Sequence, residues 1–143
     1  TKLRKVITKS EVTAATGPAI DIAYFGLSES FSYNLFISPN ATQTLTFGTI
    51  PGATHTQLAN LQESCNCSSV LRPAAFDAIA NGAALNAISF TETAAANNPF
   101  SNVLPRVILF QNASGKKGAI KVKQMVQAGQ LSYIVCDIKV QKD

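Results

Sequence analysis

The chain has 143 residues, of which 46% are hydrophobic and 14% are charged, and its formal net charge is +4. A chain of this length builds one hydrophobic core, so we expect a single domain over residues 1–143. The composition excludes a disordered tail, which requires low hydrophobicity and high charge, and no apolar run approaches the ~18–20 residues of a membrane-spanning helix.

The basic residues gather near the two ends. Residues 1–9 contain four Lys or Arg and no acid, residues 116–143 contain six lysines and two acids, and the section between contains two arginines and six acids. Lysine clusters occur on surfaces that bind nucleic acid or anionic membranes, but nucleic-acid surfaces also carry arginine and stacking aromatic residues. Residues 1–9 and 116–130 contain no aromatic residue. We therefore expect lysines on the solvent face of two edge strands, where they discourage aggregation, and no nucleic-acid partner.

The first third of the chain predicts a hairpin. Leu3–Thr8 favours a first strand. After the Gly17-Pro18 breaker, Ile20–Phe25 alternates apolar and polar positions, and Phe31–Ile37 does so again before Ser38-Pro39. This period of two is typical of strands, and Gly26–Ser30 is long enough for the hairpin loop.

The middle of the chain predicts short helices. Thr54–Gln62 places Leu58 and Leu61 three residues apart, which indicates one helical segment. Pro73 suits the first position of a second helix, and Asn81-Gly82 suits its end. Ala84–Thr91 then alternates and favours a strand.

The last third predicts an antiparallel meander. Val107–Phe110 is an apolar, β-branched run, Ile120–Gln124 alternates with lysines, and Leu131–Gln141 alternates again. Turn residues separate these runs at 112–118 and 127–130. The chain as a whole is therefore predicted to be mainly β, a single antiparallel β-sandwich with one or two short helices in the central connection. An α+β fold with the Pro73–Asn81 helix packed on an open sheet is the alternative.

Three cysteines, Cys65, Cys67 and Cys136, and one histidine, His55, could supply four metal ligands by number. The one-residue gap in Cys65-Asn66-Cys67 is shorter than zinc sites use, so no metal site and no cofactor are predicted. The strand alternation turns Cys136 inward, and a long-range disulfide would constrain the unfolded chain by roughly 4 kcal/mol. We predict one disulfide, Cys67–Cys136 ahead of Cys65–Cys136, and a Cys65–Cys67 bond ranks below both because its ring is very small. The alternative is that all three cysteines are free thiols that only pack in the interior.

The sequence contains none of the motifs that carry catalysis in common enzyme families. His55 is the only imidazole, and no Gly-x-Ser-x-Gly elbow accompanies it. Neither the phosphate-binding loop nor the dinucleotide-binding glycine motif occurs. We therefore expect no enzyme and assign no catalytic residue. Tyr133 is the aromatic ring expected to be most exposed.

Five segments carry a resemblance to a known family: Ile20–Phe25, Leu35–Pro39, Asn97–Phe100, Phe110–Lys123 and Asp137–Lys142. Together they resemble segments of small Bacteroidetes cell-envelope lipoproteins of unknown function. The resemblance implies a protein of the cell surface, outer membrane or periplasm, with a lipid-anchoring cysteine upstream of Thr1 as its only membrane attachment. The family carries no activity that could be transferred to particular residues.

Together these patterns predict a non-catalytic extracytoplasmic domain that acts as a binding or accessory module of the cell envelope. The expected partner is another envelope protein or a surface glycan. The alternative is a structural subunit that assembles with copies of itself into a surface layer, fibre or capsid.

Overall fold

The computed structural model of the chain describes residues 5–26, 30–44 and 47–142. Its strands form two antiparallel sheets, one of two strands and one of four, and its helices are few and short. The mainly-β prediction is therefore confirmed. In the described ranges, no helix has the length and apolar character needed to cross a membrane.

The smaller sheet is the predicted N-terminal hairpin. It pairs β1 (Ala23–Gly26) with β2 (Asn34–Ile37), and Tyr24 lies opposite Phe36. Both strands are shorter than predicted, and residues 27–29 of the predicted loop lie outside the described residues. The predicted first strand is only partly described, and residues 5–8 form no strand but lead into the short 3-10 helices η1 (Lys9–Glu11) and η2 (Gly17–Ala19).

The larger sheet contains the predicted C-terminal meander. Its strand order is β3-β4-β5-β6, and the strands are β3 (Gln57–Ala59), β4 (Arg106–Gln111), β5 (Lys117–Val126) and β6 (Tyr133–Val140). A bulge shifts the β5–β6 register between Val122 and Gln124, and the 3-10 helix η5 (Gly129–Leu131) forms the connection. The meander prediction is confirmed.

The prediction of a helix over Thr54–Gln62 is wrong. Leu58 packs on one face of the larger sheet and Ala59 on the other, because residues 57–59 pair with β4 as a strand. A 3-10 turn, η4 (Gln62–Ser64), follows. The three residues are a strand because they pair with the buried strand β4, although the spacing of Leu58 and Leu61 favours a helix. In short segments such tertiary pairing commonly outweighs the local pattern.

The two short helices are α1 (Pro73–Ala78) and α2 (Gly82–Asn86), and the 3-10 helix η3 (Pro39–Thr44) follows β2. Pro73 opens α1 as predicted. However, Asn81 does not end that helix: its Oδ1 accepts a hydrogen bond from Ala83 N–H at 3.0 Å and so caps the start of α2. The strand predicted at Ala84–Thr91 is therefore wrong, because its first residues are helical.

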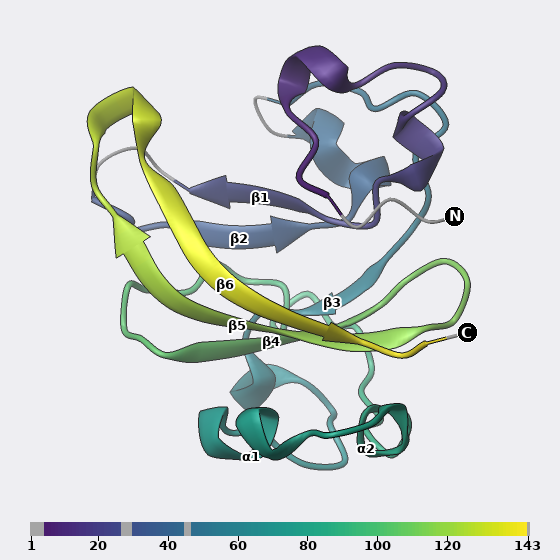
Figure 1. Cartoon of the computed structure of the whole chain (residues 1–143), viewed down its shortest axis with the longest axis vertical. Coiled ribbons are helices and arrows are strands. Elements are labelled where there is room, and N and C mark those ends of the chain that lie inside the picture. Colours follow the sequence, from purple (N-terminus) through teal and green to yellow (C-terminus); the bar gives the residue numbers. More distant parts are fainter. Residues whose placement is uncertain (1–4, 27–29, 45–46, 143) are drawn as a thin grey trace.

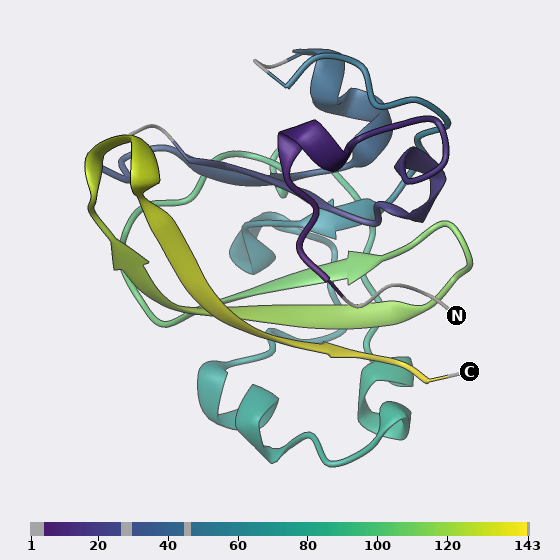
Figure 2. The same cartoon turned by 45° about the horizontal axis from the view of Figure 1, so that its top comes forward.

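The larger sheet is buried on both faces. On one face, Phe36 of β2 and Phe100 pack with apolar side chains of β3, β4 and β5. On the other, Phe76 of α1 and Leu85 of α2 pack on Val107, Leu109 and Ala119. Figures 1 and 2 show this order, with β1 and β2 on one side of the larger sheet and α1 and α2 on the other. Burial on both faces explains why β4 is apolar throughout residues 107–110.

Candidate functional site

The three cysteines lie on opposite faces of the larger sheet. Cys65 and Cys67 are joined by a disulfide with a Cα–Cα distance of 5.3 Å, and Cys136 is a free thiol. Both disulfide cysteines pack against the cluster on the helical face, whereas Cys136 packs against the cluster facing β2. The predicted Cys67–Cys136 bond and its Cys65–Cys136 alternative are therefore wrong, because the sheet separates the partners.

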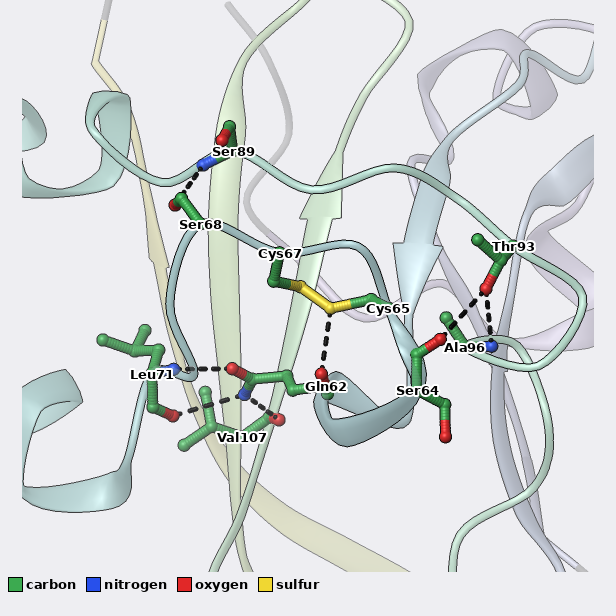
Figure 3. Close-up of a disulfide and its surroundings, with 10 residues drawn as sticks. All are labelled: Gln62, Ser64, Cys65, Cys67, Ser68, Leu71, Ser89, Thr93, Ala96 and Val107. Carbon is green, nitrogen blue, oxygen red and sulfur yellow. Dashed lines mark hydrogen bonds between the residues drawn. A yellow bond between two sulfur atoms is a disulfide. The ribbon is translucent and has the colours of Figure 1, made fainter.

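The side chain of Gln62 anchors the disulfide loop, as Figure 3 shows. Its Oε1 accepts from Leu71 N–H at 2.6 Å, and its Nε2 donates to the carbonyl oxygens of Leu71 at 3.2 Å and of Val107 at 2.6 Å. Cys65 Sγ lies 3.0 Å from the Gln62 carbonyl oxygen. One buried amide therefore connects both ends of residues 62–71 with β4.

His55 lies in a row with a hydroxyl and a carboxylate. Its Nε2 is 3.0 Å from Glu92 Oε2, and its Nδ1 is 3.5 Å from Ser38 Oγ. However, Ser38 is only 6% exposed, and its hydroxyl donates to Asn40 Oδ1 at 2.7 Å and accepts from Thr56 N–H at 2.8 Å. A nucleophile hydrogen-bonds to its base at about 2.6–3.2 Å and must reach substrate. Ser38 follows β2, His55 precedes β3, and Glu92 belongs to the 91–97 segment. The three side chains therefore connect these parts of the chain, which is a structural arrangement.

The cluster was missed from the sequence because its members are far apart in the chain. Ser38, His55 and Glu92 are separated by 17 and 37 residues, and no motif of fixed spacing connects them. The same holds for metal ligands: within residues 5–26, 30–44 and 47–142, no three His, Cys, Asp or Glu side chains come together in a way that could hold an ion.

Two lysines of the C-terminal strands, Lys121 on β5 and Lys139 on β6, contact α1. Lys121 and Lys139 place their Nζ atoms 5.4 and 4.9 Å from the centre of the Phe76 ring. Lys121 also pairs with Asp77, and Lys139 donates to the carbonyl oxygens of Phe76, Asp77 and Ile79 at 2.8–3.0 Å. The expectation of lysines on edge strands is wrong for Lys121, since β5 lies inside the sheet and α1 covers this face.

A hollow of about 480 Å³ lies where three loops and the end of β5 meet. In Figures 1 and 2, the connection between β5 and β6, which contains η5, and the loop that leads into β4 lie at the same end of the molecule. The residues that line the hollow are Ser30, Phe31, Asn102, Leu104, Lys123, Gln124, Met125, Val126 and Gln127. Its volume falls within the range of roughly 300–1,000 Å³ that small-molecule sites occupy.

The lining of the hollow includes three solvent-exposed carboxamides. Within the described part of the chain, the side-chain amides of Asn102, Gln124 and Gln127 form no hydrogen bond or ion pair. Next to lining residues stand two largely exposed apolar residues: Val103 (70%) follows Asn102 in the chain, and Tyr133 (54%) pairs with Val126 across the β5–β6 ladder. The exposure of Tyr133 confirms the sequence prediction. This end of the molecule therefore combines unused amides, a lysine and exposed apolar side chains.

Comparisons of the chain with protein-family models, with curated proteins and with solved structures find no significant match.

Proposed function

We propose that this chain is a non-catalytic binding or accessory module that works outside the cytoplasm, in the cell envelope, and that its ligand is a surface glycan held in the hollow at the end of β5. The observation that carries the proposal is the set of unused amides in that hollow. Carboxamides both donate and accept hydrogen bonds, which matches the hydroxyl groups of a sugar chain. Tyr133 beside the hollow adds an exposed ring with a polar tip.

Three further observations support the proposal. The Cys65–Cys67 disulfide suits an oxidising compartment. The hydroxyl of Ser38 is engaged by Asn40 and Thr56, which supports a structural rather than a catalytic purpose for the His55 row. The resemblance to envelope lipoproteins points to the same location.

We also propose that the two sheets are the layers of a β-sandwich. Phe36 of the smaller sheet shares a buried cluster with Ile108 and Ile120 of the larger one, and face-to-face packing of this kind defines a sandwich.

Binding can be tested by titrating the 143-residue chain with soluble oligosaccharides and following backbone amide signals by NMR. We expect cell-wall and capsular oligosaccharides to shift the signals of residues 102–104 and 123–127. Asn102→Ala should weaken binding, whereas Asn98→Ala, which alters an exposed asparagine outside the hollow, should not. If no oligosaccharide shifts these signals, or if both variants bind equally, the glycan proposal is wrong; signals shifted by an envelope protein instead would identify the other expected partner.

The alternative function, a structural subunit that assembles with copies of itself, is supported by one feature. β6 is eight residues long and lies at the edge of its sheet, and such an edge can pair with another chain. Sedimentation at micromolar concentration separates the two functions: large regular assemblies would favour the structural subunit, and a monomer or a closed dimer would favour the binding module.

A further inference from the structure

Within residues 5–26, 30–44 and 47–142, the outer edge of β6 has no strand beside it. β6 pairs with β5 alone, and among the described residues no backbone hydrogen bond reaches its outer side. Ile138, in its C-terminal half, is 59% exposed. A long edge strand with an exposed apolar residue is a template for pairing.

The β5–β6 register determines which backbone groups point outward. Gln141 N–H donates to the Lys117 carbonyl oxygen at 3.0 Å, so these two residues form a hydrogen-bonded pair. In an antiparallel ladder such pairs alternate with pairs that exchange no hydrogen bond. The next pairs along the register are Gly118↔Val140, Ala119↔Lys139 and Ile120↔Ile138. Of these only Ala119↔Lys139 is hydrogen-bonded, so the N–H and C=O groups of Val140 and Ile138 point away from β5. Two residues further along, those of Cys136 do so as well.

We propose that two copies of this chain pair through β6, antiparallel, around a two-fold axis at Ile138. In this arrangement Ile138 lies opposite its own copy, and Cys136 lies opposite Val140 of the second copy. All three residues direct their backbone groups across the interface, which provides about six hydrogen bonds. The two sheets then join into one sheet of eight strands, and the exposed side chains of the two Ile138 residues lie side by side.

The charges on β6 favour this register over the others that the backbone directions allow. These include axes at Asp137 and at Lys139, where two like charges would face each other across the axis. With the axis at Ile138, Asp137 lies directly opposite Lys139 of the second copy, and the pair occurs twice. With the axis at Cys136, Asp137 would face Val135 instead. With the axis at Val140, Lys139 would face Gln141. Opposite charges on directly opposed cross-strand residues attract each other, and only the first register places them so. Each charge also keeps its partners within its own chain, Lys123 for Asp137 and the α1 carbonyl oxygens for Lys139.

The other edge of the sheet does not offer a comparable strand, so the pairing closes at two copies. β3 has three residues, and its N–H groups are partly engaged, since Leu58 N–H donates to Glu92 Oε1 at 3.3 Å. The following Leu61 N–H donates to the Ala96 carbonyl oxygen at 2.9 Å. A self-complementary contact of this type forms a dimer rather than a filament. The dimer does not depend on a ligand in the hollow, and either proposal can fail without the other.

The first test is sedimentation velocity of the 143-residue chain over a range of concentrations. Because the interface is one strand pair wide, we expect a weak dimer with a dissociation constant of about 10–100 μM. Ile138→Lys places two like charges on the axis and should leave a monomer at every concentration. Val103→Lys makes the same change at an exposed apolar position outside β6 and should dimerise like the wild type.

The second test fixes the register by cross-linking. In the Cys136→Ala background, Ile138→Cys should form an inter-chain disulfide under mild oxidation, because hydrogen-bonded cross-strand pairs have Cα–Cα distances of about 5.5 Å. The wild-type chain should not cross-link through Cys136, since the two Cys136 residues lie roughly 13 Å apart along the strands. Thermal melts of each variant check that it folds.

Three results would overturn the proposal. The first is a wild-type chain that stays monomeric at about 500 μM, well above the expected dissociation constant. The second is equal dimerisation of the Ile138→Lys and Val103→Lys variants. The third is a Cys136–Cys136 cross-link in the wild type, which would place the axis at Cys136.

Discussion

The side-chain amide of Asn60 is hydrogen-bonded to both backbone groups of Phe36. Its Oδ1 accepts from Phe36 N–H at 2.8 Å, and its Nδ2 donates to the Phe36 carbonyl oxygen at 2.8 Å. Phe36 belongs to β2 and Asn60 directly follows β3, so the amide connects the two sheets. Asn60 is fully buried, and its side chain occupies the place that a neighbouring strand would take beside β2.

Replacing Asn60 with alanine should therefore destabilise the fold strongly. Two buried backbone groups of Phe36 would lose their partner, at about 1–3 kcal/mol each, so we expect a loss of roughly 3 kcal/mol in the free energy of unfolding, measured by urea denaturation. Asn98→Ala, at an exposed asparagine, should change stability by no more than about 0.5 kcal/mol. Equal losses in the two variants would contradict the bridging function of Asn60.

Thr56 offers a stabilising substitution. Its side-chain oxygen is buried and, among the described residues, has no hydrogen-bond partner. Valine has nearly the same shape and removes a hydroxyl whose unpaired burial costs ~1–3 kcal/mol. We expect Thr56→Val to raise the free energy of unfolding by about 1 kcal/mol in the same denaturation experiment. A loss of stability would instead show that the hydroxyl binds an internal water molecule.

Gly118 is the position where a side chain is least tolerated in the larger sheet. It lies opposite Phe110 on β4, and a Cβ atom there would overlap the Phe110 ring and lie 2.8 Å from the Lys139 carbonyl oxygen. Overpacking of this kind costs ~1–3 kcal/mol, so we expect Gly118→Ala to lower the melting temperature clearly. Gly82→Ala is the matched control, because the nearest atom to its Cβ would be 3.9 Å away; a similar decrease in both variants would contradict the packing argument.

Alkylation followed by mass spectrometry tests the cysteine arrangement. Without reductant, only Cys136 has a free thiol, so the unfolded, non-reduced chain should take up one label, and the reduced chain three. In the folded chain this labelling should be slow at neutral pH. Burial, with a further contribution from Asp137, raises the pKa of the Cys136 thiol, and the thiolate is the reactive form. A label found on Cys65 or Cys67 without reduction would contradict the disulfide.

Tyr24 should make stability depend on pH in the alkaline range. Burial raises the pKa of Tyr24 from 10.0 to about 12, and its hydroxyl donates to Asn34 Oδ1 at 2.8 Å. Because the folded pKa exceeds the unfolded one, this stabilisation is complete below about pH 10 and is lost as the pH rises towards about 12. Comparing urea denaturation of the wild type and Tyr24→Phe from pH 8 to 12 isolates the effect, since other groups titrate alike in both. The stability difference between the two should shrink as the pH rises, and a constant difference would contradict it.

The strands that alternate or are continuously apolar could be predicted from the sequence. β4, β5 and β6 were expected because their apolar residues repeat over long runs separated by turn residues. β3 was not, because it has three residues and gains its conformation from pairing Leu58 with Phe110 far along the chain. The start of α2 was missed for a related reason: an Asn-Gly pair suits a helix end, and only the geometry shows that Asn81 caps the following helix.

The candidate site could be predicted only in part. The exposed ring of Tyr133 followed from strand alternation, but the hollow depends on loops at 30–31 and 102–104 that meet β5 only in three dimensions. Likewise, the alternation along residues 131–141 correctly predicted that the side chain of Cys136 points inward. It could not indicate which side of the sheet the Cys65–Cys67 loop occupies. Buried amides such as Asn60 and Gln62 leave no periodic signal, because each acts through hydrogen bonds with distant backbone.

The central position of β4 and β5 has a consequence for how the chain folds during its synthesis. Both hydrophobic clusters take most of their sheet residues from these two strands, which lie in the last third of the chain. While the ribosome is still producing residues 1–105, the β1–β2 hairpin, β3 and both helices have no surface on which to bury their apolar side chains. Protection of Phe36, Phe76 and Leu85 from solvent therefore begins only when the last third of the chain emerges, and a nascent chain that stalls before residue 126 exposes two sets of apolar residues to chaperones and proteases.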